Sequence, residues 1–397
     1  MTLTNNSQLI KNILIENIQA SPQQRITFAE YMNLVLYHPQ FGYYSSGTVE
    51  IGSQGDFFTS SSLGTDFGEL LAEQFVNMWQ ILGYPTPFTL IEMGAGSGML
   101  AIDILQYLQH YYPDFFAILE YIIVEQAEGL IERQQALLRE KFDNYLKLAW
   151  KYWQDIPEDS IIGCCFSNEL VDALPVHQII IEDGQLREIY LTISEDNLIE
   201  IIAEPSTPKL GEYFKLVGID LPSNNYSDGY RTEVNLVALE WVETIAKRLQ
   251  RGYLLTIDYG YTAQRYYHPQ RYQGTLQCYY QHRRHNNPYS NIGHQDITAH
   301  VDFTALERQG ELWGLKKLGF TQQGMFLMAL GLGDRLSALS GGKFNFQEVL
   351  KRRDSLHQLI EPHGLGGFGV LVQSKGLTEK ERNSLFKGLN FSEKNPS

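Results

Sequence analysis

The sequence is short of cysteine, of long apolar runs and of targeting signals. Its three cysteines, Cys164, Cys165 and Cys278, include an adjacent pair that rarely forms a mutual disulfide, and no spacing typical of metal ligands is present. So few thiols suit a reducing compartment. No uninterrupted apolar stretch approaches the ~20 residues of a membrane-spanning helix. The N-terminus lacks the apolar core of a secretory signal and the arginine-rich character of a transit peptide. We therefore expect a cytoplasmic protein with no membrane span and no bound metal.

Basic residues are also scarce, because 31 Lys and Arg stand against 46 Asp and Glu, a formal net charge of −15. A surface of that sign does not favour nucleic acid or anionic membrane, since both bind basic faces. It would attract a basic protein or peptide. The 397 residues, 43% of them hydrophobic, are enough for one large domain or two ordinary ones with a sizeable core.

One stretch, F-T-L-I-E-M-G-A-G-S-G over residues 88–98, organises the rest of the chain. A short apolar run ends in Glu92, and Gly94, Gly96 and Gly98 then follow at alternate positions. The pattern after the last glycine is helical. A strand, a glycine-rich turn and a helix let a ligand approach bare backbone at a helix N-terminus. The stretch therefore predicts a cofactor site.

The region before this strand is predicted to be helical. Residues 6–20 and a stretch beginning after Thr27 have amphipathic patterns, and Glu30 would complete a capping box with Thr27. A third helix is expected over residues 65–82. Between the second and third helices, residues 52–64 (G-S-Q-G-D-F-F-T-S-S-S-L-G) combine Gly, Ser and Thr with paired aromatics. Because linkers seldom carry paired aromatics, we weigh a ligand-covering loop equally with a surface linker.

From residue 88 onward, apolar runs alternate with helical patterns, which predicts a doubly wound α/β sheet with right-handed crossovers. Two insertions interrupt it: an alternating stretch over 176–217 with a hairpin turn at Asp183-Gly184, and an irregular stretch over 262–300 rich in Tyr, His and Arg. Further helices are expected over 303–312 and near 325–360. The tail after Lys375 is polar and is expected to fray. The candidate strands are residues 88–93, 120–125, 147–152, 161–167, 252–258 and 368–373.

The glycine spacing leaves two kinds of cofactor open. Nicotinamide dehydrogenases carry G-x-G-x-x-G with an acid about 20 residues later, whereas here the third glycine comes one residue early. S-adenosylmethionine (SAM) has no phosphate. Its site needs backbone close to the methionine part and carboxylates for the ribose hydroxyls and the positive charges. Glu92, directly before the turn, fits SAM better.

Polar residues follow each of the next strands, and such strand ends meet at one edge of the sheet. Glu125 ends the second strand and could accept both ribose hydroxyls. Asp155, after the third strand, or its neighbouring backbone could meet the adenine amino group. Asn168 and Glu169 directly follow the fourth strand. Any single acid could be a solvated loop residue, but four such features in sequence order favour SAM.

With S-N-E-L-V-D-A-L-P beside E-M-G-A-G-S-G, the sequence resembles the MidA family of SAM-dependent methyltransferases, which includes a mitochondrial complex I assembly factor. The resemblance covers nearly the whole chain. One departure is T-S-S at residues 59–61, where the family usually has T-S-P. Further matching blocks, in order, are F-G-Y-Y, G-D-F-F-T-S-S-S-L-G-T-D-F-G, L-L-T-I-D-Y-G-Y, G-T-L-Q-C-Y-Y-Q-H and G-H-Q-D-I-T-A-H-V-D-F.

The resemblance implies the class I methyltransferase fold, which is α/β, Rossmann-like and seven-stranded, here with a helical N-terminal addition and a β-hairpin and irregular insertion. We divide the chain into an N-terminal helical region with a ligand-covering loop (1–87), a methyltransferase domain (88–376) and a polar tail (377–397). Insertions fall at 176–232 and 262–302. In the mitochondrial member of the family, the acceptor is a protein arginine.

The resemblance also implies roles for individual positions. The glycine-rich turn and the acid before it would form the SAM-binding loop. The acid after the second strand would bind the ribose of SAM. The polar pair after the fourth strand would contact the methionine part of SAM and the approaching acceptor. The implied residues are Glu92, Gly94, Gly96, Glu125, Asn168 and Glu169.

Arginine chemistry demands acids beside the donor. A guanidinium has a pKa above ~12 and is a poor nucleophile while protonated, so carboxylates must orient it and disperse its charge next to positive SAM. Glu169 and Asp172 lie three residues apart, on one face of a helical turn, although Asp172 could equally be a turn residue before Pro175. Asp258, just past the fifth strand, could bond to acceptor-binding loops, although Gly260 alone could explain a turn there. We take Glu169, Asp172 and Asp258 as catalytic candidates.

The segment 293–303 carries His294, Asp296 and His300. The spacing His-x-Asp-x-x-x-His fits no strong zinc pattern, so it favours a polar network over a metal site. We take these three residues, with Tyr259 and His282, as substrate-binding candidates that line an acceptor cleft.

The sequence therefore predicts a SAM-dependent methyltransferase acting on a protein acceptor, at arginine. A respiratory-complex subunit is one candidate acceptor, and a homodimer is left open. Two other functions also stay open: a SAM-binding assembly factor or scaffold without essential catalysis, and a small-molecule methyltransferase.

Overall fold

The computed structural model describes residues 3–45, 60–142, 147–195, 197–281, 283–341 and 345–390. Two predicted features fall outside these ranges in whole or in part. Residues 52–59 of the predicted ligand-covering loop are not described, and neither is His282.

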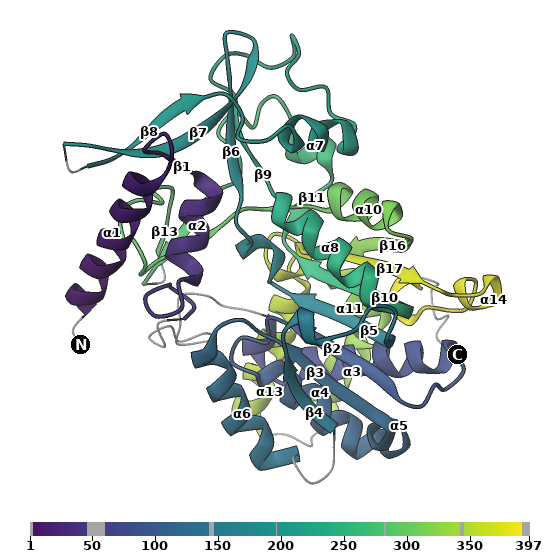
Figure 1. Cartoon of the computed structure of the whole chain (residues 1–397). Helices are drawn as coiled ribbons and strands as arrows, with labels where there is room; N and C mark the ends of the chain where they lie inside the picture. Colours follow the sequence, from purple (N-terminus) through teal and green to yellow (C-terminus); the bar gives the residue numbers. More distant parts are fainter. Residues whose placement is uncertain are drawn as a thin grey trace.

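A seven-stranded mixed sheet forms the centre of the protein, in the order β16-β17-β10-β5-β2-β3-β4 (Figure 1). Strands β4, β3, β2, β5 and β10 are mutually parallel, whereas β17 is antiparallel to both of its neighbours. The predicted doubly wound sheet is confirmed. The seventh strand, β16, was not assigned from the sequence, because Gly319 interrupts it and its side chains are largely solvent-facing. The bounds are β2 Phe88–Met93, β3 Leu119–Val124, β4 Lys147–Lys151, β5 Ile161–Asn168, β10 Leu249–Asp258, β16 Lys316–Gln322 and β17 Gly369–Lys375.

Helices cover both faces of this sheet (Figure 1). Alternate residues of each strand enter different cores: Leu90 packs on one face and Ile91 on the other. The same period of two sends Cys164 and Cys165 to opposite faces, which keeps the adjacent thiols apart. The first face is covered by α3 (Asp66–Ile81), α4 (Met99–Tyr111), α5 (Pro113–Ile118) and α6 (Glu128–Phe142), and the second by α8 (Leu236–Arg248) and α10 (Phe303–Leu312).

A second sheet joins the N-terminal region to the first insertion. The short strand β1 (Ile26–Thr27) pairs with β7 (Gln185–Ser194), so residues far apart in sequence share one sheet. The predicted hairpin is confirmed, because Glu182 pairs with Gln185 across Asp183 and Gly184, both with positive φ. The predicted capping box of Thr27 and Glu30 is also present at the start of α2. The other elements here are α1 (Leu3–Ala20), α2 (Phe28–Tyr37), β6 (His177–Glu182), β8 (Asn197–Ala203), α7 (Lys209–Val217) and β9 (Arg231–Val234).

The second insertion is more regular than the sequence predicts. It contains a three-stranded antiparallel sheet, β13-β12-β14, which packs against the N-terminal helices. Ile10 and Phe28 from those helices share one core with Cys278 and Ile297 from the insertion. The bounds are β11 Gly260–Tyr261, α9 Ala263–Tyr266, β12 Gln277–Tyr280, β13 Arg283–His285, β14 Asp296–Thr298 and β15 Val301–Asp302.

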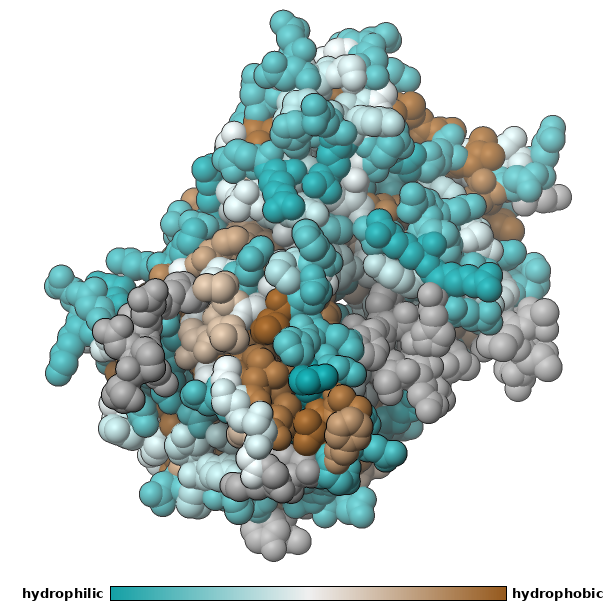
Figure 2. Space-filling model, turned by 180° about the vertical axis from the view of Figure 1, so that it is seen from behind, coloured by the Kyte–Doolittle hydropathy of each residue, from teal (hydrophilic) through white to brown (hydrophobic). Residues whose placement is uncertain are grey.

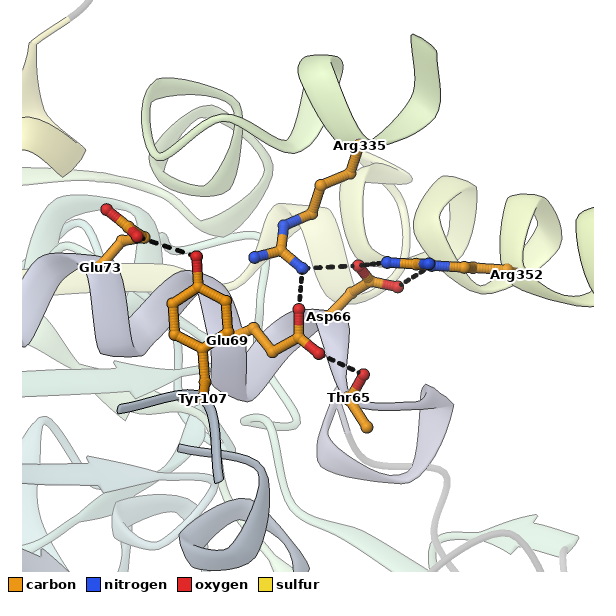
Figure 3. Close-up of polar contacts among 7 residues, drawn as sticks. All are labelled: Thr65, Asp66, Glu69, Glu73, Tyr107, Arg335 and Arg352. Atoms are coloured by element: carbon orange, nitrogen blue, oxygen red, sulfur yellow. Dashed lines mark hydrogen bonds and ion pairs between the residues drawn. The ribbon is translucent and has the colours of Figure 1, made fainter. Parts of the chain in front are cut away.

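Charged groups link two of the C-terminal helices, α12 and α13, to α3. The bounds of these helices are α11 Gln323–Ala329, α12 Leu332–Ala338 and α13 Phe346–Ile360. Arg352 donates two hydrogen bonds to Asp66, at 2.7 and 2.8 Å, and Arg335 bridges Asp66 and Glu69 (Figure 3). Hydrogen bonds from these arginines outweigh the effect of burial and lower the pKa of Asp66. The bidentate Arg352–Asp66 pair fixes orientation as well as distance and holds α13 against α3, while Arg335 links α12 to the same helix.

The chain after Lys375 is not frayed as expected over its described part. Phe386 is buried and its ring lies 5.7 Å from that of Tyr253, while the Lys387 amide donates to Asn77 at 3.0 Å. An apolar anchor thus holds this polar segment to the domain. Its short helix is α14 (Glu379–Arg382).

The rear surface is hydrophilic over much of its area, with apolar side chains gathered in its lower central part (Figure 2). Large exposed apolar side chains on the C-terminal helices include Met325, Met328 and Phe346, the last 76% exposed. Within the described ranges, no helix combines the length and hydrophobicity needed to cross a bilayer.

Candidate active site

The glycine-rich turn forms one wall of a cavity at the carboxyl end of β2. Gly94, Gly96 and Gly98 have φ values of 68°, 53° and 82°, in the left-handed region that favours glycine. A Cβ on Gly94 would lie 2.7 Å from Cδ1 of Leu170. The turn therefore needs glycine for its conformation and for close packing, and it presents bare backbone to the cavity just before α4 begins.

Two acids predicted to bind cofactor line the same cavity. Glu92 is buried in β2 and accepts a hydrogen bond of 2.7 Å from the Tyr121 hydroxyl. Burial raises its pKa to about 7. Glu125 follows β3, and its Oε1 accepts from the amides of Gln126 and Ala127, at 2.8 and 3.1 Å. Burial also raises the pKa of Glu125. These backbone bonds fix the Glu125 carboxylate at the cavity wall.

Gln134 was not identified from the sequence. Its side chain is fully buried in α6, donating to the Gly96 carbonyl at 2.9 Å and to Glu125 at 3.4 Å, and accepting from the Trp150 indole at 3.0 Å. It thus connects the glycine turn to the acid after β3. The available signal was a polar residue on the buried stripe between Leu130 and Leu138, a position where an apolar side chain is the rule.

Asn168, the last residue of β5, and Glu169, which follows it, form the next wall. Glu169 has φ of 53°, unusual for a residue with a side chain. Its carboxylate accepts from the Ser60 amide and from the Asn168 side chain, both at 3.1 Å. Burial raises its pKa to about 7. A non-glycine residue held in this conformation costs about 1–3 kcal/mol, which indicates that the side chain itself is needed at this point.

Asp172 lines the cavity, whereas Asp258 lies beneath it. Oδ2 of Asp258 accepts from the amides of Leu170, Val171 and Asp172, at 3.2, 2.9 and 3.3 Å. Asp258 is fully buried, and burial raises its pKa well above the ordinary value. It is therefore a positioning residue that shapes the loop carrying Glu169 and Asp172. Burial raises the pKa of Asp172 itself to about 6.

The wall opposite these acids comes from the N-terminal region and the second insertion. The Tyr44 hydroxyl donates to Asp296 at 2.8 Å, and its ring stacks on Tyr37 with centroids 5.4 Å apart. The Tyr37 hydroxyl donates to the Ala173 carbonyl at 2.8 Å. Both tyrosines, Asp296 and Tyr259 line the cavity. Tyr44 belongs to the motif F-G-Y-Y, but nothing in the sequence around it shows that it meets residue 296.

Four predicted site residues do not line this cavity among the described residues. Asp155 is exposed and caps a turn by accepting from the Tyr152 amide at 3.2 Å. His300 packs between two tyrosines, and burial lowers its pKa to about 4. Burial likewise lowers the pKa of His294. Asp258 is the fourth, and His282 lies outside the described residues.

A neighbouring cavity shares Tyr37, Gly94, Glu125 and Leu170 with the first and extends to Trp241. Among the described residues that line these cavities, Asn168 Oδ1 and Trp241 Nε1 are buried and have no hydrogen-bond partner. An acceptor and a donor left unpaired in adjoining cavities suit a ligand with polar groups along its length. No group of His, Cys, Asp and Glu able to hold a metal occurs in the described part of the chain.

Comparisons with known proteins agree with this geometry. A family model described as "Putative S-adenosyl-L-methionine-dependent methyltransferase" matches residues 70–321. A COG1565 superfamily member from Burkholderia thailandensis, solved with bound S-adenosyl-homocysteine, is 30% identical with a TM-score of 0.82, over 95% of this chain and 94% of that one. The predicted fold class and the predicted cofactor, SAM, are both confirmed.

Curated relatives carry a more specific name. "Protein arginine methyltransferase NDUFAF7 homolog, mitochondrial" from Drosophila melanogaster is 29% identical over 367 residues, 86% of this chain and 79% of that protein. The Rattus norvegicus protein of corresponding name is 30% identical over 368 residues, with the same coverage.

Proposed function

We propose that this chain, which belongs to the MidA family of SAM-dependent methyltransferases, transfers a methyl group from SAM to an arginine side chain of a protein. The observation that carries the proposal is the convergence of Glu169, Asp172 and Asp296 on one cavity beside the glycine turn. Tyr37 and Tyr44 add aromatic walls. Acids with aromatic faces suit a planar cation better than a neutral acceptor.

The residues of the first cavity fit the donor. Glu125 would accept the ribose hydroxyls, and the turn around Gly94 and Gly96 would face the methionine part. In the neighbouring cavity, Trp241 Nε1 is buried without a partner in the described structure and would offer a hydrogen-bond donor to the adenine. When bound, SAM supplies the methyl group and leaves as S-adenosyl-homocysteine.

The acids then act on the acceptor. Glu169 and Asp172 would orient the guanidinium and disperse its charge, which opposes the repulsion between two cations. The reacting nitrogen must also lose a proton. Because burial raises the pKa of Glu169 to about 7 and that of Asp172 to about 6, either carboxyl can hold that proton near neutral pH. Asp258 keeps both side chains in place through their backbone.

Titration calorimetry with SAM tests the donor half of the proposal, with Glu125→Ala as the variant that should lose binding. Radiolabelled SAM incubated with lysate from a deletion strain, followed by mass spectrometry of the labelled band, tests the acceptor. Label on arginine supports the proposal. Label on another residue or on a small molecule would contradict it, and SAM binding without any transfer would identify a scaffold instead.

Two further expectations from the sequence stay predictions. The three cysteines are free and buried, which agrees with a reducing compartment, and fractionation of cells would test the cytoplasmic location. The candidate acceptor from a respiratory complex is tested by the mass spectrometry above.

A further inference from the structure

One stretch of this acidic protein carries charge of the opposite sign. Residues 259–295 contain four arginines and no Asp or Glu, although the whole chain has a net charge of −15. The arginines are Arg265, Arg271, Arg283 and Arg284. We propose that the surface of this acid-free segment around Arg265 and Arg271 is a docking site for acidic residues of the protein acceptor, next to the cavity that receives its arginine. The inference rests on the proposed function and names the kind of acceptor that it would take.

Two of these arginines converge on one ring. The guanidinium carbons of Arg265 and Arg271 each lie 4.4 Å from the ring centroid of Tyr261. Nε of Arg271 is buried and has no hydrogen-bond partner in the described structure. An open surface hollow is lined by Thr262, Gln264, Arg265, His268, Gln270 and Arg271, none of them acidic. Two gathered like charges beside a polar hollow would be stabilised by an anion.

No carboxylate of the described structure supplies that anion. Arg231, Arg251, Arg335 and Arg352 all pair with Asp or Glu, whereas none of the four arginines of the acid-free segment forms an ion pair among the described residues. Glu233 is a buried acid near the segment, but its carboxylate accepts hydrogen bonds from other groups and forms no ion pair with these arginines in the described structure.

The carboxylate of Glu233 is committed to the backbone. It accepts from the amides of Thr275 and Leu276, at 2.9 and 3.3 Å, and from the Tyr266 hydroxyl at 3.2 Å. Burial raises its pKa, so its negative charge is disfavoured. The arginines therefore keep their positive field toward solvent. The positive charges of Arg271, Arg284 and Arg265 also act on His300, because they add to the lowering of its pKa by burial.

A chain of rings leads from the arginines to the cavity. Tyr261 stacks on His300 with centroids 5.0 Å apart, and His300 meets Tyr259 edge-on at 5.0 Å. Tyr259 lines the cavity beside Asp172. The path has three steps: 4.4 Å from the arginines to Tyr261, 5.0 Å from Tyr261 to His300, and 5.0 Å from His300 to Tyr259. Because an extended peptide rises about 3.3 Å per residue, about four residues would span it. The surface thus fits an acceptor with an acid three or four residues from its methylated arginine.

Opposite charges at the two ends would also set the direction of binding. The acidic cavity attracts the arginine and repels carboxylates, while the basic surface does the reverse. A peptide with an acid at this spacing can satisfy both ends in one orientation.

Fluorescence anisotropy with two labelled synthetic peptides tests this, in the presence of S-adenosyl-homocysteine. Each peptide carries one central arginine, with either glutamates or glutamines three and four residues to both sides. We expect the glutamate peptide to bind about fivefold more tightly at low salt, from a small gain at each arginine. The preference should vanish in Arg265→Gln/Arg271→Gln and persist in Arg265→Lys/Arg271→Lys, which keeps both charges. Lys351→Gln/Arg353→Gln removes two exposed charges from α13 instead, and the preference should survive there.

Equal binding of the two peptides to the unmodified protein would overturn the proposal, as would a preference that survives in Arg265→Gln/Arg271→Gln. A labelled single-stranded oligonucleotide that binds more tightly than the glutamate peptide, with the same dependence on these arginines, would overturn the choice of partner. Replacing the central arginine by norleucine separates the two proposals. If the norleucine peptides still show the glutamate preference, the docking surface is supported even if arginine is not the acceptor. SAM binding, measured by calorimetry, does not depend on docking and tests the proposed function separately.

Discussion

The proposed donor side and the proposed acceptor side of the cavity are built in different ways. Most of the proposed donor side comes from one stretch, from Glu92 through the glycine turn to Glu125 and Gln134, and it relies on backbone and on a few fixed carboxylates. The acceptor side brings together Tyr44, Asp172 and Asp296, which belong to three distant segments. The proposed cofactor site thus depends mainly on a local motif, whereas the proposed acceptor site depends on separate segments that the fold brings together.

The two sides should therefore respond differently to mutation. Changes on the donor side should weaken SAM binding, whereas changes on the acceptor side should lower turnover or acceptor affinity and leave SAM binding intact.

The largest effect is expected for Glu169→Gln. Removing a charge aimed at the reacting group should lower kcat for arginine methylation on the order of 10²–10³-fold, with SAM affinity nearly unchanged. Glu195→Gln is the matched control, because Glu195 also has positive φ, at 47°, but is exposed in a turn. Steady-state kinetics and calorimetry give the two readouts. A parallel loss of SAM binding would show that Glu169 belongs to the donor side.

Glu125→Ala should mainly affect the donor. Loss of charge-assisted hydrogen bonds to both ribose hydroxyls should weaken SAM binding about 100-fold, measured by calorimetry. Glu128→Ala, an exposed acid three residues further on, is the control and should leave affinity unchanged. An unaltered Kd for Glu125→Ala would mean that the ribose is held elsewhere.

Tyr44→Phe should raise the KM for the acceptor about tenfold. It removes the hydrogen bond of 2.8 Å to Asp296 but keeps the ring stacked on Tyr37, and one lost bond to a charged group corresponds to about 1.5 kcal/mol. The Kd for SAM should stay the same. Tyr111→Phe, at an exposed tyrosine, should change neither value. A tenfold change in SAM affinity with an unchanged KM for the acceptor would show that Tyr44 belongs to the donor side instead.

The smallest effect is a pH dependence. Burial raises the pKa values of Glu92 and Glu169 to about 7 and that of Asp172 to about 6. Between an ordinary carboxyl pKa of about 4 and these values, the folded state binds more protons than the unfolded state, so stability is lost as pH rises toward 7. The Tm of the ligand-free protein should fall by a few degrees from about pH 5 to pH 7.5.

Donor binding should oppose this fall, because positive SAM stabilises the ionised acids. The increase in Tm on adding SAM should therefore be larger at pH 7.5 than at pH 5.5, as measured by differential scanning fluorimetry. In Glu169→Gln the slope of Tm against pH should be shallower. A Tm that rises across this pH range would contradict the raised pKa values.

Much of the sheet and of the donor side could be predicted from the sequence. Strand, turn and helix are encoded locally, and polar residues directly after buried strands must lie at the sheet's carboxyl edge. Predictions were weaker where a residue's role depends on partners. Asp258 has the position of a catalytic acid, yet its carboxylate accepts three backbone amides. Asp155 follows a strand as expected, but its own turn engages it and leaves it exposed.

Periodicity and local spacing along the chain are enough to place the α/β core, the glycine turn before α4 and the acids Glu92, Glu125 and Glu169. Three other facts come from the fold: Tyr44 meets Asp296, Gln134 joins the turn to Glu125, and the arginines beside Tyr261 form no ion pair within the described chain. Those facts depend on contacts between segments separated along the chain, which packing creates and local pattern does not encode.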